Sequence, residues 1–376
     1  MKALILSCNT GQGHNSAGKA LFECFVRHGI PCEMKDALSF AGEKASRLVS
    51  NGYINMATHA PNLFRCLYAA GGLVSTSYSK SPVYWANLSY ADALHGYICE
   101  KGFDTVVTPH LFPAEALTHL LRKHALAARC YAVATDYTCI PFWEETELHG
   151  YFIPHRDLIP EFAAKGLPRN RLHPFGIPVS AGFSQHTSQK EARRILGLPE
   201  EGQIFLMMSG SMGFGNLEDL LARLLRLCLR GEHILVLGGN NERMKQRLRT
   251  RYGSHPQVSI LDFTKQVPLY MDACDLIFTK PGGLTSTEAA VKNLPLIHTA
   301  PIPGCETKNA LFFRRHLLSI SEKNPDALLH QAYALAYDET AQRTMLAAQR
   351  KHIPHDAAEQ ICQHIILEAR LKERAV

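Results

Sequence analysis

Long uninterrupted apolar runs are missing from this 376-residue chain. The run LLARLLRLCL is interrupted by Arg223 and Arg226, whereas a membrane-spanning helix needs about 20 consecutive apolar residues. The first residues, MKALILSCNTGQGH, hold a short apolar run followed by a polar glycine-rich loop, where a signal peptide requires a longer apolar core. We therefore expect no membrane span and no cleaved leader, and we interpret this start as a buried strand.

Paired cysteine motifs, fixed-period repeats and low-complexity tracts are also missing. The 11 cysteines are odd in number and include no CxxC pair, which favours scattered core thiols in a reducing cytoplasm over a disulfide framework or a zinc site. The lack of a repeat or biased tract excludes a solenoid and a disordered chain. We expect an ordinary globular protein.

Charge of one sign is in small excess, with a formal net charge of +6 and a pI near 8.7. The basic residues are dispersed, and no helix-turn-helix, RNP-like aromatic signature or zinc-finger spacing accompanies them, so we expect no nucleic-acid partner. A mild positive excess of this kind favours binding to an anionic membrane surface or to a phosphate-bearing ligand. The alternative is that the charge only keeps the protein soluble.

The sequence does contain many short, β-rich apolar runs, most of them followed by a loop and a helical pattern. Unbroken apolar strands of this kind are typical of a sheet covered on both faces. The runs are 2–8, 105–110, 129–136 and 150–155 in the first half, and 203–211, 233–239, 258–263, 276–281 and 294–300 in the second. They predict an α/β protein with two parallel, doubly wound sheets.

The length favours two domains of similar size. We expect the boundary near Ser184, because Pro178 and Gly182 close the strand-like run FGIPVSAGF and a polar stretch follows. The predicted parts are residues 1–184, residues 185–354, and a helix over 355–376 that is placed to pack back on the first domain.

Residues 38–97 break this scheme, with helical patterns, many aromatic side chains and no strand. Aromatic rings mixed with Arg47, Arg65 and Lys80 suit a membrane interface or a lipid acceptor. An inserted helical region with an ordinary aromatic core is the alternative.

The first strand runs into the glycine-rich loop Gly11-Gln12-Gly13-His14-Asn15-Ser16, which opens a helix. Glycines permit a tight turn and a close approach to a ligand, although the spacing is not that of a dinucleotide site. An imidazole at such a junction can accept a hydroxyl proton near neutral pH, so His14 is a candidate general base, with a structural role as the alternative.

Two loops of the second half have the same strand, glycine turn and helix arrangement. The loop with Gly210, Ser211 and Gly213 offers backbone amides for a diphosphate. The segment KPGGLTSTEA has Gly283 at a strand end and Glu288 in the helix that follows, where a carboxylate suits the two hydroxyls of a ribose or compensates the helix dipole.

A further polar loop, PGCETKN, follows the next strand and suits the reading of sugar hydroxyls through Glu306 and Asn309. The other candidate donor-site residues of the second half are Thr285 and Ser286.

Five segments together resemble the monogalactosyldiacylglycerol synthases and processive diacylglycerol glucosyltransferases, which are relatives of the enzyme that forms lipid II. The resemblance covers most of the chain, and its most specific part is the pair of donor-site motifs. The segments are GQGHNSAG, ATDYTCIPFW, FGIPV, KPGGLTSTEA and PGCETKN.

This resemblance implies a GT-B fold and inverting transfer of a hexose from a UDP-sugar to a lipid, without a metal or another cofactor. It implies His14 as the base, with Asp136 orienting it or the acceptor, although Asp136 also suits a helix cap. Gly13 joins the expected donor contacts, and Tyr137 and Trp143 are expected at the acceptor. The expected location is the inner face of the cell membrane, with diacylglycerol as the acceptor.

Two departures from the family pattern stand out. Ile140 replaces a histidine that usually precedes the tryptophan, and Cys305 replaces a glutamine before Glu306. Three alternatives stay open at this point. They are transfer to another lipid-linked acceptor, epimerisation of a UDP-sugar on the same scaffold, and a non-catalytic nucleotide-sugar sensor.

Overall fold

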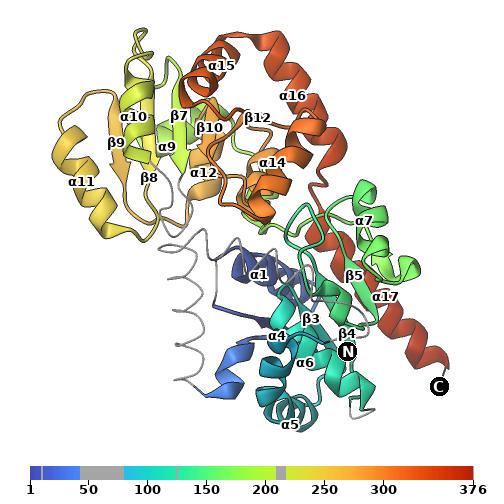
Figure 1. The fold of residues 1–376 in the computed structure, drawn as a ribbon. Helices are drawn as coiled ribbons and strands as arrows, with labels where there is room; N and C mark the ends of the chain where they lie inside the picture. Colours follow the sequence, from blue (N-terminus) through green and yellow to red (C-terminus); the bar gives the residue numbers. More distant parts are fainter. Residues whose placement is uncertain (10–11, 43–79, 124–125, 209–216, 376) are drawn as a thin grey trace. The chain divides into compact units, whose positions relative to one another are not determined.

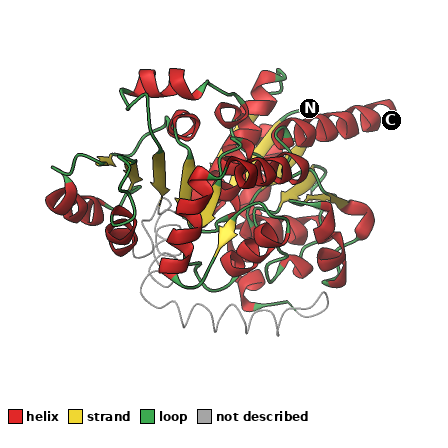
Figure 2. Ribbon diagram, turned by 90° about the horizontal axis from the view of Figure 1, so that it is seen from above, coloured by secondary structure: helices red, strands yellow, loops and turns green. Residues whose placement is uncertain are grey.

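A computed structural model describes residues 1–376 except 10–11, 43–79, 124–125, 209–216 and 376. The chain divides into two compact units. The first comprises Met1–Ala181, Pro303–Cys305 and Asp356–Val376, and the second comprises Gly182–Ile302 and Glu306–His355. Each unit has its own parallel sheet with helices on both sides of the strands (Figures 1 and 2).

The sheet of the first unit has the strand order β2-β1-β3-β4-β5-β6, and every pair is parallel. All residues of the central strands β1 and β3 are buried, as the apolar runs predict. The strands are β1 (Ala3–Ser7), β2 (Cys32–Asp36), β3 (Thr105–Thr108), β4 (Arg129–Val133), β5 (Gly150–Phe152) and β6 (Leu172–His173).

The helices of the first unit cover this sheet. The longest, α17 (Ala357–Ala375), packs against α1 (Gln12–Arg27), where Ile361 and Ile365 join Leu21 and Phe25 in one hydrophobic core. No helix among the described residues is both long and apolar enough to cross a membrane. The other helices are α4 (Pro82–Asn87), α5 (Ala91–Lys101), α6 (Leu111–Arg122), α7 (Ile159–Ala164) and a 3₁₀ turn at Ala37–Ala41.

The sheet of the second unit has the order β12-β11-β10-β7-β8-β9, again parallel throughout. Its strands are β7 (Ile204–Met208), β8 (His233–Leu237), β9 (Val258–Leu261), β10 (Leu276–Thr279), β11 (Leu296–His298) and β12 (Ile320–Ser321). Its helices are α8 (Ala181–Ser184), α9 (Gln189–Leu196), α10 (Leu217–Leu225), α11 (Glu242–Tyr252), α12 (Val267–Ala273), α13 (Gly283–Val291), α14 (Cys305–Arg315), α15 (Pro325–Tyr337) and α16 (Glu339–His352).

Each of the nine apolar runs forms a strand, and the predicted fold class of two doubly wound parallel sheets is confirmed. The strand predicted over FGIPVSAGF is wrong, because residues 174–180 are irregular. Gly176 has a φ of 97°, which no strand residue adopts, and Pro178 has no amide hydrogen to donate. Within 38–97, residues 82–97 are helical as expected, and 43–79, including Arg47 and Arg65, lie outside the described residues.

Candidate functional site

His14 stands where the strand order of the first sheet reverses direction. The chain leaves β1 for α1, and it leaves the neighbouring strand β3 for α6. In doubly wound sheets, ligands bind at the carboxyl ends of the strands at this reversal. Gly13 and His14 occupy the first turn of α1 and are both half-buried. The fold therefore places the candidate base at the position where such a sheet binds its ligands.

The imidazole of His14 is fixed through one of its two nitrogens. Its Nδ1 lies 2.9 Å from the carbonyl oxygen of Pro109 and 3.0 Å from Oγ1 of Thr135. A carbonyl oxygen only accepts, so the Pro109 contact requires the proton on Nδ1. In that tautomer Nε2 carries the lone pair and is the nitrogen able to take a proton from a substrate.

The pKa of His14 is lowered, first of all because burial disfavours the charged imidazolium. The negative charge of Asp136 and the hydrogen bond to Pro109 act in the opposite direction and raise the pKa in part. A lowered pKa keeps the imidazole neutral at physiological pH, which is the state that a general base needs. The structure thus brings Asp136 close enough to influence His14.

A second histidine, His110, lies beside His14 but has a different role. Its ring meets the His14 ring edge-on at 4.6 Å between centroids. The Nδ1 of His110 accepts a hydrogen bond of 3.1 Å from the backbone amide of Phe112 and so caps α6. Burial, and then the nearby His14, lower the pKa of His110 well below its ordinary value. His110 is therefore a neutral helix cap that packs against the candidate base.

A chain of side-chain hydrogen bonds holds the start of α1 in place. Ser7 Oγ donates to Asn15 Oδ1 at 2.6 Å, Asn15 Nδ2 donates to Asn9 Oδ1 at 2.8 Å, and Asn9 Nδ2 donates to Asp36 Oδ2 at 2.9 Å. This chain links β1, α1 and the end of β2, which bracket the glycine loop. It fixes the backbone that carries His14.

The candidate acceptor residues Tyr137 and Trp143 lie inside the first unit. Tyr137 is 2% exposed and Trp143 is 3% exposed, and the Trp143 ring packs edge-on against Tyr151. The loop that holds them is anchored on α7, where Glu161 accepts hydrogen bonds from Thr138 Oγ1 and the Cys139 amide. The structure therefore brings Asp136 to His14 and places the two aromatic side chains in the core behind this loop.

The strand order of the second sheet reverses between β7 and β10. The loop after β7, with the candidates Gly210, Ser211 and Gly213, lies outside the described residues. After β10, a turn at Lys280–Gly282 leads into α13, with Gly283 as its first residue. Gly282 and Thr285 are half-buried and Glu288 is 8% exposed. The spacing of three residues places these last three residues on one face of the helix.

Glu288 is a buried carboxyl group to which no described residue donates a hydrogen bond. Burial raises its pKa to about 8. A buried carboxyl group without a donor is costly once it ionises, unless a ligand supplies the missing hydrogen bonds. Two neighbouring hydroxyl groups, such as those of a ribose, are suitable donors for such a group.

Ser286 faces the interior, away from the half-buried face of α13. It is fully buried, and its Oγ lies 2.9 Å from Nε2 of His298. The Nδ1 of His298 lies 3.0 Å from Oγ of Ser319, and burial lowers the pKa of His298 to about 3. These contacts join α13 to β11 and to the residue before β12. In this structure Ser286 contributes to the core beneath the turn.

Glu306 and Asn309 hold the Lys280–Gly282 turn against α14. Glu306 forms an ion pair with Lys280 and accepts a 2.8 Å hydrogen bond from the Ile302 amide. The fully buried Asn309 donates to the Pro281 carbonyl at 3.1 Å. Both side chains therefore hold the turn that precedes α13. Their predicted contacts with a sugar stay a prediction.

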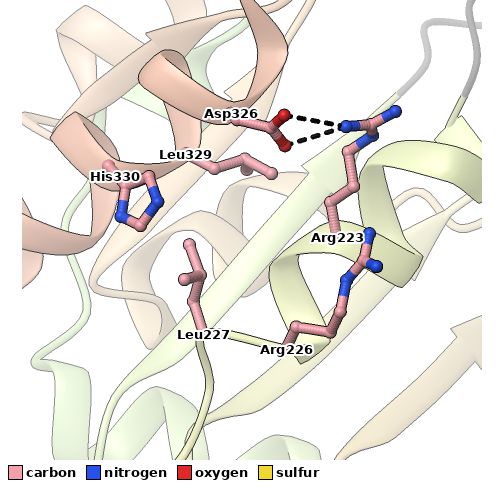
Figure 3. Close-up of a pocket in the computed structure, with 6 residues that line it drawn as sticks. All are labelled: Arg223, Arg226, Leu227, Asp326, Leu329 and His330. Carbon is pink, nitrogen blue, oxygen red and sulfur yellow. Dashed lines mark hydrogen bonds and ion pairs between the residues drawn. The ribbon is translucent and has the colours of Figure 1, made fainter.

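A pocket of about 170 Å³ lies elsewhere in the second unit, between α10 and α15 (Figure 3). Arg223, which lines it, donates two hydrogen bonds of 2.8 and 3.0 Å to Asp326 and one of 2.8 Å to Asp219. Its charge is thus paired within the protein. None of the candidate donor residues lines this pocket, so we do not assign it to the donor.

Two groups that contact His14 could not be identified from the sequence, namely the Thr135 hydroxyl and the Pro109 carbonyl. They lie 121 and 95 residues from His14, and only the parallel packing of β3 and β4 beside β1 brings them together. Asn15 stands within the glycine loop motif, yet its hydrogen-bonding role depends on partners from other segments.

Two family models match this chain, one in each half of the sequence. Residues 14–179 match the family model for monogalactosyldiacylglycerol (MGDG) synthase, and residues 204–361 match the glycosyltransferase family 28 C-terminal domain. The processive diacylglycerol beta-glucosyltransferase of Bacillus cytotoxicus is 24% identical over 341 residues, which are 90% of this chain and 86% of that protein.

Solved structures share the fold at low identity. MurG of Acinetobacter baumannii has a TM-score of 0.63 at 13% identity, covering 97% of this chain and 99% of that one. The UDP-GlcNAc 2-epimerase from Neisseria meningitidis bound to UDP-GlcNAc also has a TM-score of 0.63 at 13% identity, covering 99% and 100%. The GT-B fold is thereby confirmed, while these likenesses do not separate a transferase from an epimerase.

The sequence matches do separate them, because both family models and the curated relatives are glycosyltransferases. The chain is therefore a hexosyltransferase that contains a monogalactosyldiacylglycerol synthase domain and a glycosyltransferase family 28 C-terminal domain, and it is similar in sequence to processive diacylglycerol beta-glucosyltransferases.

Proposed function

We propose that this enzyme transfers a hexose from a UDP-sugar to the hydroxyl group of a lipid, with inversion at the anomeric carbon and without a metal ion. The observation that carries the proposal is the neutral imidazole of His14 at the strand-order reversal, with Nδ1 facing the Pro109 carbonyl and Nε2 left to act. The names of the relatives support a diacylglycerol acceptor. A lipid-linked acceptor of the lipid II type is the alternative.

In the proposed reaction, Nε2 of His14 removes the proton from the acceptor hydroxyl as its oxygen attacks the anomeric carbon. The new carbon–oxygen bond forms on the face opposite the diphosphate, and the bond from the anomeric carbon to the β-phosphate oxygen breaks. UDP leaves with the electron pair, and the proton stays on the imidazole until solvent takes it. Thr135 and Pro109 keep the ring oriented, and Asp136 stabilises the imidazolium that forms.

The second unit is the proposed donor-binding unit. Glu288 accepts the ribose hydroxyls, and Gly282 and Thr285 on the same helix face give the nucleotide a close approach to the backbone. The amides at the start of α13 favour the negative charge of the departing diphosphate. Solved relatives of the same fold have been obtained with UDP, which supports this choice of nucleotide.

Incubation with labelled UDP-sugars tests the class of reaction. We expect label from one UDP-hexose to enter the lipid fraction of mixed vesicles that contain diacylglycerol, at the same rate with and without added Mg²⁺ or Mn²⁺. Separate chromatography of the nucleotide fraction detects an epimerised donor. Epimerised UDP-sugar without lipid product, or transfer that requires added Mg²⁺ or Mn²⁺, would contradict the proposal.

We further propose that the protein works at the inner face of the cell membrane as a peripheral protein. The net charge of +6 supports attraction to anionic lipid, and the aromatic-rich segment with Arg47, Arg65 and Lys80 supplies candidate contacts, most of which lie outside the described residues. We expect the protein to sediment with anionic vesicles and to be released by salt. Equal binding to neutral and anionic vesicles at low salt would count against this attraction.

A further inference from the structure

Three side chains with metal-ligating atoms meet where the end of α1 packs against the start of α17. Cys24 is fully buried, and His28 follows it by one helical turn, with its amide donating to the Cys24 carbonyl at 3.1 Å. Glu359 lies in the first turn of α17. One ligand atom from each of the three lies within 4.8 Å of the other two.

The carboxylate of Glu359 joins the other two groups. Its Oε2 accepts a hydrogen bond of 3.2 Å from the Cys24 thiol, and its Oε1 lies 2.6 Å from Nε2 of His28. Around a tetrahedral zinc ion, neighbouring ligand atoms lie roughly 3.3 to 3.8 Å apart. Small side-chain rotations therefore open the three groups to the spacing that such an ion requires.

Cys362, one turn after Glu359 on the same helix, lies outside this group of three, and its thiol would have to turn toward the group to become a fourth ligand. Its thiol is buried, interacts with the Cys24 thiol, and donates to the Leu21 carbonyl at 3.8 Å. The two helices thus offer paired positions, Cys24 with His28 and Glu359 with Cys362, that face each other across one interface. This arrangement of two facing helical pairs can surround an ion.

We propose that Cys24, His28, Glu359 and Cys362 bind one zinc-class divalent ion that ties α17 to α1. Thiolate and imidazole ligands select zinc over magnesium or calcium. On binding, each thiol releases its proton to solvent, His28 binds as the neutral ring, and Glu359 binds ionised. Two thiolates and one carboxylate supply three negative charges, which the divalent ion and the nearby Arg27 balance.

Arg27 forms an ion pair with Glu359 and must shift its guanidinium away from the carboxylate, while remaining near the site, when the ion binds. It lies 3.8 Å from Glu359 Oε2, and its side chain is 57% exposed, so it can turn toward solvent. The site is separate from the proposed chemistry, because Cys24 follows His14 by ten positions on α1, or about 15 Å of helix. The ion is structural, and a metal-free transfer reaction is compatible with it.

Cobalt titration of the full-length, reduced, chelator-treated protein tests the proposal. We expect one equivalent of Co²⁺ to bind with the charge-transfer absorption of a thiolate ligand and to be displaced by Zn²⁺. Cys24→Ser and Glu359→Gln should weaken binding by more than about 100-fold. His28→Ala, at a partly exposed position, serves as a further variant if the buried changes impair folding.

Cys99 and His95 on α5 provide a matched control. Like Cys24 and His28, they are four residues apart on one helix, and the Cys99 sulfur lies 3.4 Å from His95 Nε2. Neither belongs to a group of three or more candidate metal ligands among the described residues. Cys99→Ser should leave cobalt binding unchanged. The proposal fails if wild type shows no thiolate charge-transfer band, if Cys24→Ser binds as tightly as wild type, or if mass spectrometry finds Cys24 and Cys362 joined in a disulfide.

Discussion

His14→Ala should slow turnover by about 100-fold to 10,000-fold, the usual contribution of a general base. The reason is that Nε2 of His14 is the proposed proton acceptor, while Nδ1 of the neighbouring His110 is engaged by the Phe112 amide as a helix cap. UDP affinity and melting temperature should stay near their wild-type values. Steady-state kinetics, calorimetry with UDP and a thermal melt measure these three quantities.

His119→Ala supplies the matched control, since His119 lies on α6, away from the contacts of His14. It should leave turnover unchanged. Near-normal turnover in a folded His14→Ala protein would refute the assignment and would make Asp136 the next candidate for the acceptor's base. A lowered melting temperature with turnover preserved per folded molecule would indicate a structural histidine.

The pH dependence of turnover follows from the lowered pKa of His14. The base is active when neutral, so turnover should fall only as the pH drops through a value below that of an ordinary histidine. The charge of Asp136 raises that pKa, so Asp136→Asn should move the acidic limb of the profile to lower pH. A shift to higher pH would contradict this electrostatic role.

Glu288→Ala should weaken UDP binding by about 1.5 to 3 kcal/mol, which corresponds to roughly 10-fold to 150-fold, through loss of the charge-assisted hydrogen bonds to the ribose. Because burial raises the pKa of Glu288 to about 8, the carboxyl group is largely protonated in the free protein at neutral pH. Ribose hydroxyls favour the ionised form, so binding should tighten as the pH rises toward about 8. Calorimetry at several pH values measures both effects.

Glu288→Gln keeps the size of the side chain but removes its titratable carboxyl group. The UDP affinity of this variant should therefore not increase as the pH rises toward about 8. Glu322→Gln, at an exposed carboxylate of the same unit, should bind UDP as wild type does. Unchanged UDP affinity in Glu288→Ala would remove Glu288 from the donor site.

The buried strands could be predicted from the sequence because each is an unbroken apolar run, as in β1 and β7. The strand β2, with the sequence CEMKD, could not, since it is only half-buried and carries charged residues at the sheet edge. The two-residue strands β6 and β12 are too short to leave a pattern. Gly176 and Pro178 explain why an apolar run at 174–180 forms no strand.

The sequence predicts those site residues that can be recognised from their own local segment. His14 and Glu288 follow strand ends in glycine-rich junctions, and the structure places them at the two strand-order reversals. The partners of His14 could not be predicted, because Pro109 and Thr135 come from other strands. The same holds for the Cys24 cluster, whose members His28 and Glu359 are 331 residues apart. The absence of a CxxC pair in the sequence had argued against a zinc site.

The anomeric configuration of the lipid product tests the central proposal most directly. Proton NMR of the glycolipid formed without added Mg²⁺ or Mn²⁺ from an α-linked UDP-hexose and diacylglycerol should show a β-linked sugar on the lipid hydroxyl, as a single attack assisted by His14 requires. An α-linked product would contradict the inverting mechanism, and the absence of any glycolipid with every UDP-hexose would contradict the proposed transfer itself.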